Sequence, residues 1–346
     1  MSLYEFVRQM PKAELHVHLE GTVRPETLLE LAQTHGVDLP ARDAEALRRW
    51  YTFRDFDHFL DVYIKICSCL RTAEDFERVT FEYGRSMAAQ NIRYAEVTFS
   101  PSTHVLAPDG IGWNALLDAV NAGRARAQDA FGVEMRWIPD IVRCHPETSM
   151  TVAGWLTSDK AASGGIVALG LGGPEVGYPP ELFAEAFAYA RRYGLHSNPH
   201  AGETVGPESV WGALRALGAE RIGHGVRAIE DAALVDHLVA QATPLEVNLT
   251  SNLCLGVYPS YAAHPLKALY EAGVPVTLNS DDPALFNTTL IDEYLHAVAD
   301  CGLTLEQLED VALNAVRVAY LPPTQKAVLL DEFEEAYAAL HRTLNM

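Results

Sequence analysis

The sequence lacks long apolar stretches. None of its hydrophobic runs reaches the roughly 18 residues that a membrane-spanning helix needs. Residues 1–5 do not open a basic region followed by an apolar one, as a secretory signal does. We therefore expect no signal peptide and no membrane partner. With 346 residues, of which 49% are hydrophobic and 21% charged, the composition is that of a globular protein with a large core.

Cysteine is also scarce. The five cysteines form no Cys-x-x-Cys arrangement, and their odd number argues against a disulfide framework or a thiolate zinc site. Cys67 and Cys69 lie close together but fit small residues of a helix. The expected compartment is the cytoplasm.

Basic residues are few. The chain has 26 Lys and Arg and 46 Asp and Glu, which gives a formal charge of −20. Phosphate binding needs a basic surface, so nucleic acid is not an expected partner. The charge says little about a small neutral substrate. No linker, repeat or low-complexity segment interrupts the chain, and we expect one domain over residues 1–346. Nothing in the sequence indicates an oligomeric state.

Two histidines stand two residues apart in a short apolar segment, residues 15–21. On a β-strand, residues i and i+2 point to the same face, so His16 and His18 would converge at one point. Neutral imidazole is the commonest metal-ligand side chain. An isolated His-x-His pair more often consists of two half-buried histidines that bond to the backbone, so the rest of the chain must decide.

Short apolar strands alternate with helical stretches from residue 90 onward. With the first strand they make eight predicted strands, the others lying near residues 94–99, 135–142, 165–171, 197–203, 221–225, 245–249 and 275–282. This alternation predicts the α/β class and a (β/α)8 TIM barrel, with an open doubly wound sheet as the alternative. Extra helices are expected over residues 22–89 and from residue 304 to the end. The aromatic stretch 53–60 is either core or a lid over a pocket.

Polar residues follow the apolar strands at the end where a barrel of this kind has its active site. These residues are His16, His18, Glu20, His200, Glu203, His224, Asp281 and Asp282. Three imidazoles and one carboxylate suit Zn²⁺ best, although Fe²⁺ and Mn²⁺ also fit this ligand set. The histidines at 58, 104, 145 and 264 are interpreted as surface or packing residues.

Four motifs carry a family resemblance: His16-x-His18-x-x-Gly21, His200-Ala201-Gly202-Glu203, Arg221-Ile222-Gly223-His224-Gly225 and Ser280-Asp281-Asp282-Pro283. In order and spacing, from residue 11 to about residue 320, they resemble the adenosine/adenine deaminase family. The resemblance implies hydrolytic deamination of a 6-aminopurine with release of ammonia. Binuclear barrel hydrolases resemble one another in a bridging lysine of the fourth strand; residues 165–171 contain none, which favours a single metal.

The resemblance also implies a role for each motif residue. The zinc ligands would be His16, His18, His200 and Asp281. Glu203 would be the proton donor to ring N1, and His224 and Asp281 would act on the attacking water. The substrate would further contact His18, Glu20 at the sugar 5′-hydroxyl, the backbone N–H of Gly173 at N3, and Asp282 at N7. Burial beneath a purine would raise the pKa of Glu203 and keep it protonated.

The substrate is less sharply defined. Gly223 and Thr204 resemble nucleoside deaminases, whereas adenine deaminases resemble one another in Arg-Ile-Asp-His-Gly and a doubled Glu. Two positions depart from the pattern of the nucleoside deaminases. Glu20 replaces the usual Asp, and residues 170–175 replace the usual Asp-Leu-Ala-Gly-Asp-Glu. We expect adenosine or 2′-deoxyadenosine. The alternatives are a 5′-modified adenosine such as aminodeoxyfutalosine, or free adenine.

Two other classes of function fit less well. A metal-dependent hydrolase of esters or cyclic amides would share the barrel and histidines, but it would not need Glu203 with paired Asp281 and Asp282. A non-catalytic nucleoside-binding relative would be expected to have lost at least one catalytic residue. None of those residues is lost here.

Overall fold

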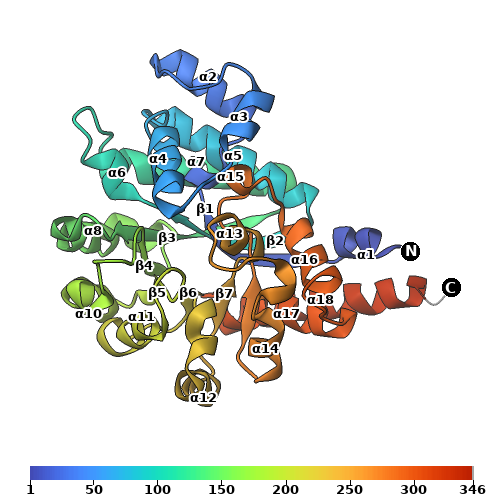
Figure 1. The fold of residues 1–346 in the computed structure, drawn as a ribbon. Coiled ribbons are helices and arrows are strands. Elements are labelled where there is room, and N and C mark those ends of the chain that lie inside the picture. Colours follow the sequence, from blue (N-terminus) through green and yellow to red (C-terminus); the bar gives the residue numbers. More distant parts are fainter. Residues whose placement is uncertain (345–346) are drawn as a thin grey trace.

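Eight parallel strands form one sheet in chain order in the computed structural model, which describes residues 1–344 (Figure 1). They are β1 (Lys12–His18), β2 (Ile92–Phe99), β3 (Glu134–Val142), β4 (Ala168–Gly172), β5 (His196–Ala201), β6 (Ile222–His224), β7 (Leu245–Val247) and β8 (Val276–Leu278). The end of β8 returns to β1, because the N–H of His18 donates to the carbonyl of Asp281 at 2.9 Å. This closure confirms the predicted (β/α)8 barrel. The alternative, an open doubly wound sheet, is wrong.

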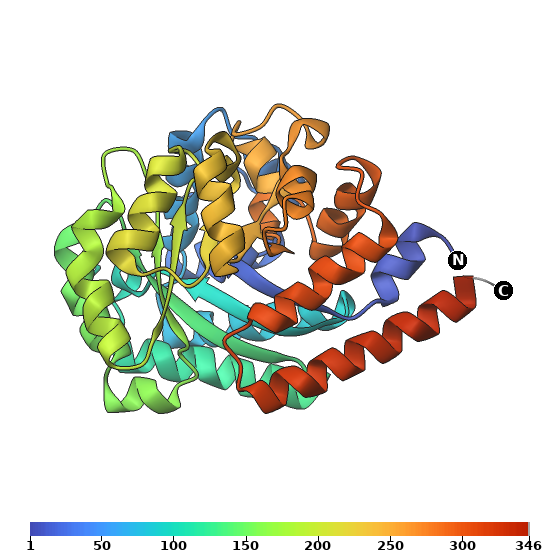
Figure 2. The same ribbon diagram turned by 90° about the horizontal axis from the view of Figure 1, so that it is seen from below.

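Helices surround the sheet in the two perpendicular views (Figures 1 and 2). The helices between successive strands are α5 (Ala73–Ala89), α7 (Trp113–Phe131), α8 (Ser149–Leu156), α9 (Asp159–Ser163), α10 (Ala184–Arg192), α11 (Pro207–Gly212), α12 (Ala232–Gln241) and α14 (Leu266–Glu271). The helix predicted at residues 113–131 has these same bounds. Among the described residues, no helix has the length and hydropathy of a bilayer span.

The extra helices lie where the sequence predicts them, except α16, which precedes the helical end predicted from residue 304. After β1 come α2 (Pro25–His35), α3 (Ala44–Trp50) and α4 (Phe56–Cys67), which project beyond the barrel in Figure 1. Helix α2 begins with proline, whose missing N–H costs nothing in a first turn, and ends at Gly36, whose φ of 63° is left-handed. At the other end of the chain lie α16 (Leu290–Ala299), α17 (Leu305–Val318) and α18 (Pro323–Leu344). The last two residues of the predicted helical end lie outside the described part.

Short helices were not predicted, because one or two turns carry too little periodicity. They are α1 (Leu3–Gln9), α6 (Pro101–Val105), α13 (Leu249–Cys254) and α15 (Pro283–Phe286). Several predicted bounds also shift. The strand predicted at 165–171 begins at Ala168, since Gly165 has a φ of 78° and Ile166 makes only an isolated bridge to Trp137.

Two glycines let α5 and α7 approach each other closely. A Cβ atom at Gly123 would lie 2.5 Å from the backbone carbonyl oxygen of Glu77, and one at Gly84 would lie 2.4 Å from the Cβ of Ala127. Real Cβ contacts do not reach such distances, so a side chain at either position would force the helices apart. The glycines therefore fix how these helices cover β2 and β3.

Replacement of Gly123 by alanine should lower the free energy of unfolding by about 1–3 kcal/mol, because overpacking at the helix contact outweighs the better helix propensity of alanine. The matched control is Gly154→Ala in α8, where a Cβ would meet nothing within 4 Å. There alanine should stabilise by up to about 1 kcal/mol. Denaturant unfolding of both variants measures the difference. Equal stabilisation by both would contradict the close approach.

Candidate active site

The predicted metal ligands converge at the carboxyl ends of the strands. His16 and His18 lie in β1, His200 lies in β5, and Asp281 is the third residue after β8. The ligand nitrogens of His16, His18 and His200 lie within 4.8 Å of one another, and so do ligand atoms of His16, His224 and Asp281. All five side chains are buried. A chain segment of about 265 residues separates the two ends of this cluster, and barrel closure brings them together.

Backbone strain accompanies the cluster. His224 has a φ of 61° and Asp281 a φ of 62°, values that non-glycine residues rarely adopt. Strand β1 holds Asp281 by two backbone hydrogen bonds. The N–H of Asp281 donates to the carbonyl of His16 at 3.1 Å, and its carbonyl accepts the N–H of His18 at 2.9 Å. Beside His224, a Cβ at Gly223 would lie 2.7 Å from Cδ2 of His200 and 2.8 Å from Cε1 of His16. Glycine is therefore required for the imidazoles to meet.

The orientation of His16 is set by a buried carboxylate. Its Nδ1 lies 2.8 Å from Oε2 of Glu246, the middle residue of β7. With the ring proton on Nδ1, the lone pair of Nε2 points into the cluster. This Nε2 is buried and has no hydrogen-bond partner, although Oδ1 of Asp281 lies 3.3 Å away. An unpartnered buried imidazole nitrogen among other imidazoles fits a metal ion, and the donor set suits a divalent one.

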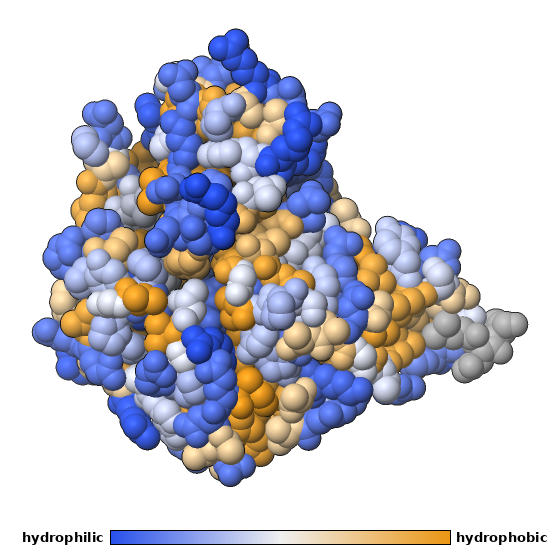
Figure 3. All heavy atoms as spheres, in the orientation of Figure 1, coloured by the Kyte–Doolittle hydropathy of each residue, from blue (hydrophilic) through white to orange (hydrophobic). Residues whose placement is uncertain are grey.

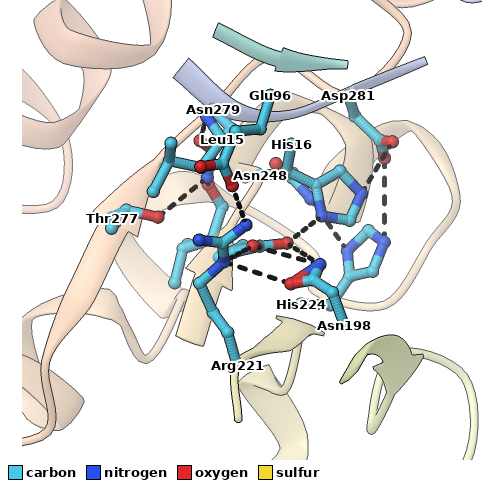
Figure 4. A network of polar contacts seen from close by, with 12 residues as sticks. Leu15, His16, Glu96, Asn198, Arg221, His224, Asn248, Thr277, Asn279 and Asp281 are labelled. Atoms are coloured by element: carbon cyan, nitrogen blue, oxygen red, sulfur yellow. Dashed lines mark hydrogen bonds and ion pairs between the residues drawn. The ribbon is translucent and has the colours of Figure 1, made fainter. Parts of the chain in front are cut away.

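Glu246 is in turn held by Arg221, which bonds its carboxylate through Nε and that of Glu96 through Nη2. Asn198 also donates to Glu246 at 3.2 Å (Figure 4). The guanidinium of Arg221 is 1% exposed and lies 4.1 Å from the ring centroid of Tyr320. One buried cation is therefore paired with two buried carboxylates beneath the cluster.

His224 faces the candidate proton donor. Its Nε2 lies 3.7 Å from Oε2 of Glu203 and 3.8 Å from Oδ2 of Asp281. Its Nδ1 lies 3.2 Å from the amide nitrogen of Asn248 and 3.4 Å from that of Asn252. Burial lowers the pKa of His224 to about 3, so the ring is neutral near pH 7. A neutral imidazole in this position can orient or deprotonate a water molecule that lies between the two carboxyl groups.

Glu203 lies beyond the end of β5 in a loop that another carboxylate organises. Glu175 accepts the backbone N–H groups of Gly202 at 2.8 Å, Glu203 at 3.0 Å and Thr204 at 2.6 Å. Burial raises the pKa of Glu203 well above the usual range of a carboxyl group, and the charges of Asp281 and Glu175 raise it further. This shift favours the protonated carboxylic acid, which is the form that can donate a proton.

A cavity opens above this cluster. One wall comes from α4 and is mainly apolar, and the opposite side comes from the loop after β4. The wall residues are Phe56, Phe59, Leu60, Tyr63 and Ile64. Gly172 at the end of β4 and the loop residues Gly173 and Pro174 also line the cavity. Figure 3 shows this face of the molecule, with apolar residues near its centre below the lobe of α2 to α4. The stretch at residues 53–60 thus contributes to the wall of the cavity. That it moves as a lid stays a prediction.

Of the predicted substrate contacts, three line the cavity: His18, Gly173 and Asp282. Oδ1 of Asp282 is buried without a partner, and a Cβ at Gly21 would come within 1.9 Å of it, so Gly21 makes room for this carboxyl. Burial raises the pKa of Asp282 well above its usual range, and Asp281 adds to the shift. Asp282 can therefore donate a hydrogen bond to a ring nitrogen.

Glu20 does not line the cavity. Its Oε1 accepts the backbone N–H of Ser100 at 3.0 Å and lies 3.1 Å from Nε2 of His104, while Tyr63 donates its hydroxyl to Oε2 at 3.3 Å. Both carboxylate oxygens are thus bound to protein groups. Glu20 is buried, and its contact with a substrate hydroxyl stays a prediction.

Sequence reasoning missed four residues that shape the site: Asp140, Glu175, Arg221 as an ion-pair partner, and Glu246. Asp140 lines the cavity from β3, and burial raises its pKa to about 7. For Asp140 and Glu246 the available signal was a charged residue inside a mainly apolar strand. The other histidines behave as expected where burial is concerned: His104 and His264 are buried with hydrogen-bond partners, and His145 is exposed beside Glu147.

Replacement of Glu246 by glutamine should lower the metal affinity about 10–100-fold, because a neutral amide holds the ring proton of His16 less strongly. Competition against a chelator of known affinity measures this directly. The matched control is Glu220→Gln, which changes an exposed glutamate paired with His196 and should leave metal affinity unchanged. Equal metal affinity in the Glu246 variant and the wild type would contradict the orienting role.

Comparison with known proteins places this geometry in a family. Residues 11–336 match the family described as Adenosine deaminase. The aminodeoxyfutalosine deaminase of Streptomyces coelicolor is 42% identical, over 97% of this chain and 87% of its own. The adenine deaminase of Cupriavidus pinatubonensis is 38% identical, over 98% of this chain and 95% of its own.

Solved structures agree with this assignment. The adenine deaminase from Arthrobacter aurescens superposes with a TM-score of 0.89 at 35% identity, covering 94% of this chain and 98% of its own. An amidohydrolase from Burkholderia ambifaria with bound Zn has a TM-score of 0.91 at 26% identity, covering 100% of this chain and 96% of its own. The chain belongs to the adenosine deaminase family and is a hydrolytic deaminase that acts on a C–N bond.

Proposed function

We propose that this protein deaminates an adenosine nucleoside with an extended 5′ substituent, of the aminodeoxyfutalosine type, and that it uses one zinc ion. The observation that carries this proposal is the position of Glu20, whose carboxylate is bound behind the cavity wall by Ser100 and His104. A cavity without this carboxylate leaves room beyond the ribose. Two aminodeoxyfutalosine deaminases of Streptomyces, 42% and 40% identical to this chain, support the same substrate class.

Adenosine, the substrate expected from the sequence, has less support, since the named relatives act on aminodeoxyfutalosine or adenine. Free adenine is the second candidate. It is favoured by adenine deaminases that are 37–39% identical over nearly the whole chain. The two candidates differ in how much of the cavity they would fill. Adenine has no 5′ substituent that could contact the wall formed by α4.

The zinc would be held by His16, His18, His200 and Asp281, the set that contains the unpartnered Nε2 of His16. When bound, such an ion supplies Lewis-acid activation of water at neutral pH. The neighbouring Glu203 lies three residues beyond His200 and is left free to face the purine.

The chain's own residues would then carry the proton transfers. Protonated Glu203 would give its proton to ring N1, which makes C6 electrophilic. His224, with Asp281 beside it, would orient the water that attacks C6. A C–O bond forms at C6, the C–N bond to the exocyclic nitrogen breaks, and ammonia leaves with the 6-oxopurine as product. Protonated Asp282 would donate to N7, and the N–H of Gly173 would donate to N3.

A panel of 6-aminopurines tests the proposal on zinc-loaded protein, with the loss of 6-aminopurine absorbance as the signal. It contains adenosine, 2′-deoxyadenosine, adenine, 5′-methylthioadenosine and aminodeoxyfutalosine. We expect aminodeoxyfutalosine to have the highest kcat/KM, at least about tenfold above adenine, because its extension adds binding energy in the outer cavity. A preference for adenine would establish the second candidate. No turnover of any compound would refute purine deamination by this site.

The Glu203→Gln variant should bind zinc as the wild type does and lose at least about 100-fold in kcat, because an amide cannot transfer a proton to N1. Metal content by elemental analysis and turnover of the best substrate are measured together. Glu208→Gln, which changes an exposed glutamate in α11, is the matched control and should keep full turnover. Wild-type kcat in the Glu203 variant would show that the proton comes from another group.

A further inference from the structure

We propose that Asp140 binds the 2′- or 3′-hydroxyl of the substrate's ribose, so that the enzyme prefers ribonucleosides to the deoxy counterpart that lacks this hydroxyl. The inference rests on the proposed nucleoside deamination and adds to it a residue that determines specificity for the sugar. Asp140 belongs neither to the four sequence motifs nor to the predicted substrate contacts.

Asp140 brings to the cavity a carboxyl group with an unused oxygen. It lies in β3, lines the cavity and is 2% exposed. Its Oδ1 is buried and has no hydrogen-bond partner among the described residues. A buried oxygen without a partner costs free energy, so in a ligand cavity it indicates that the ligand supplies the donor. Burial raises the pKa of Asp140 to about 7, and both the carboxylate and the carboxylic acid have an oxygen that accepts a hydroxyl proton.

Strand β4 leaves room for this carboxyl group. Asp140 pairs in register with Gly170, where a Cβ atom would lie 3.0 Å from the Cβ of Asp140. A Cβ atom at Gly172 would lie 2.5 Å from Oδ2 of Asp140, closer than real Cβ contacts come. Any other residue at position 172 would therefore displace the carboxyl group from its place beside β4.

The other carboxyl groups of the cavity already have roles in the proposed reaction. Glu203 would serve ring N1, Asp281 the metal and Asp282 ring N7. Among the described residues that line the cavity, Asp140 is the remaining carboxyl group. It belongs to none of the described sets of side chains whose ligand atoms lie within 4.8 Å of one another, so it is not part of the metal cluster.

The order of the strands places Asp140 on the side of the sugar. In the proposed binding mode, ring N1 faces Glu203 after β5, and ring N3 faces the N–H of Gly173 after β4. Asp140 lies in β3, the next strand of the sheet in that direction (Figure 1). Around a purine, N9 with its ribose follows N3 in the same direction, because both nitrogens are attached to C4. The ribose should therefore lie on the side of β3.

A nucleoside with a 5′ substituent has two free hydroxyl groups, at the 2′ and 3′ positions. Glu20 does not line the cavity and has protein partners on both oxygens, so Asp140 is the carboxyl group that the cavity presents to these hydroxyls. Carboxylates accept hydrogen bonds from ribose hydroxyls, as the acidic residue of dinucleotide-binding sites does. A site built in this way rejects an analogue without the hydroxyl, because its buried oxygen then stays unpaired.

The test compares 5′-methylthioadenosine with its 2′-deoxy and 3′-deoxy counterparts as substrates of the zinc-loaded protein. Wild type should favour the full riboside at least about tenfold in kcat/KM over one deoxy compound, which identifies the hydroxyl that Asp140 binds. Asp140→Ala removes the acceptor and should abolish this preference. Equal kcat/KM for all three compounds in wild type would refute the proposal, and so would a preference that survives in Asp140→Ala.

Two further variants separate the hydrogen bond from a structural effect. Asp140→Asn keeps an acceptor oxygen and should retain a preference for the riboside. Asp140→Val fills a similar volume, suits a strand and has no acceptor, so it should lose the preference even if alanine destabilises β3. The matched control is Asp129→Asn, an exposed position in α7 that does not line the cavity, and it should keep the wild-type preference. A wild-type preference in Asp140→Val would show that another group binds the hydroxyl.

Calorimetric binding of 5′-methylthioinosine and its deoxy counterparts separates this inference from the proposed function. If no aminopurine is turned over but the full riboside binds more tightly than a deoxy compound, and only when Asp140 is present, the deamination proposal fails and the ribose contact stands. If nucleosides are turned over without any ribose preference, deamination stands and the role of Asp140 is refuted. Turnover of adenine without binding of any nucleoside would refute both.

Discussion

The site depends on one buried cation, Arg221, which lies in the barrel interior between Glu96 and Glu246. Two carboxylates removed from water need such a partner, because an unpaired buried charge costs several kcal/mol, about 3–5 when a partner is lost. Once Glu246 is fixed in this way, it holds the ring proton of His16 and turns Nε2 toward the other imidazoles. Arg221 therefore sets the orientation of a metal-ligand imidazole through Glu246, although Arg221 itself does not line the cavity.

The carboxyl groups at the barrel mouth have been given different protonation states by their surroundings. Burial alone would raise the pKa of Asp281, but the neighbouring imidazoles of His16, His224 and His18 lower it below its usual range and favour the ionised carboxylate. Its neighbour Asp282 and the nearby Glu203 lack such a partner, and burial raises the pKa of both. One anionic group suited to a metal and two neutral acids suited to ring nitrogens thus stand side by side, as deamination of a purine requires.

Much of this arrangement could be predicted from the sequence, because it rests on local patterns. The two-residue spacing of His16 and His18 and the polar residues at the ends of several strands predicted the cluster, and the alternation of strands and helices predicted the barrel. What the sequence could not supply depends on register between strands far apart in the chain. Glu246 lies 230 residues from His16, and their contact exists only after closure. The orientation of Glu20 depends likewise on Ser100 and His104, which lie 80 or more residues further along the chain, and its predicted contact with a substrate stays a prediction.

The central claim is that the strand ends build a single-metal centre beside Glu203. Anomalous diffraction from crystals of zinc-loaded protein, recorded above and below the zinc absorption edge, tests it most directly. The account predicts one strong peak per chain at about 2.0–2.2 Å from nitrogen atoms of His16, His18 and His200 and from a carboxylate oxygen of Asp281. A peak elsewhere, a second adjacent metal, or ligation by Glu203 would contradict it.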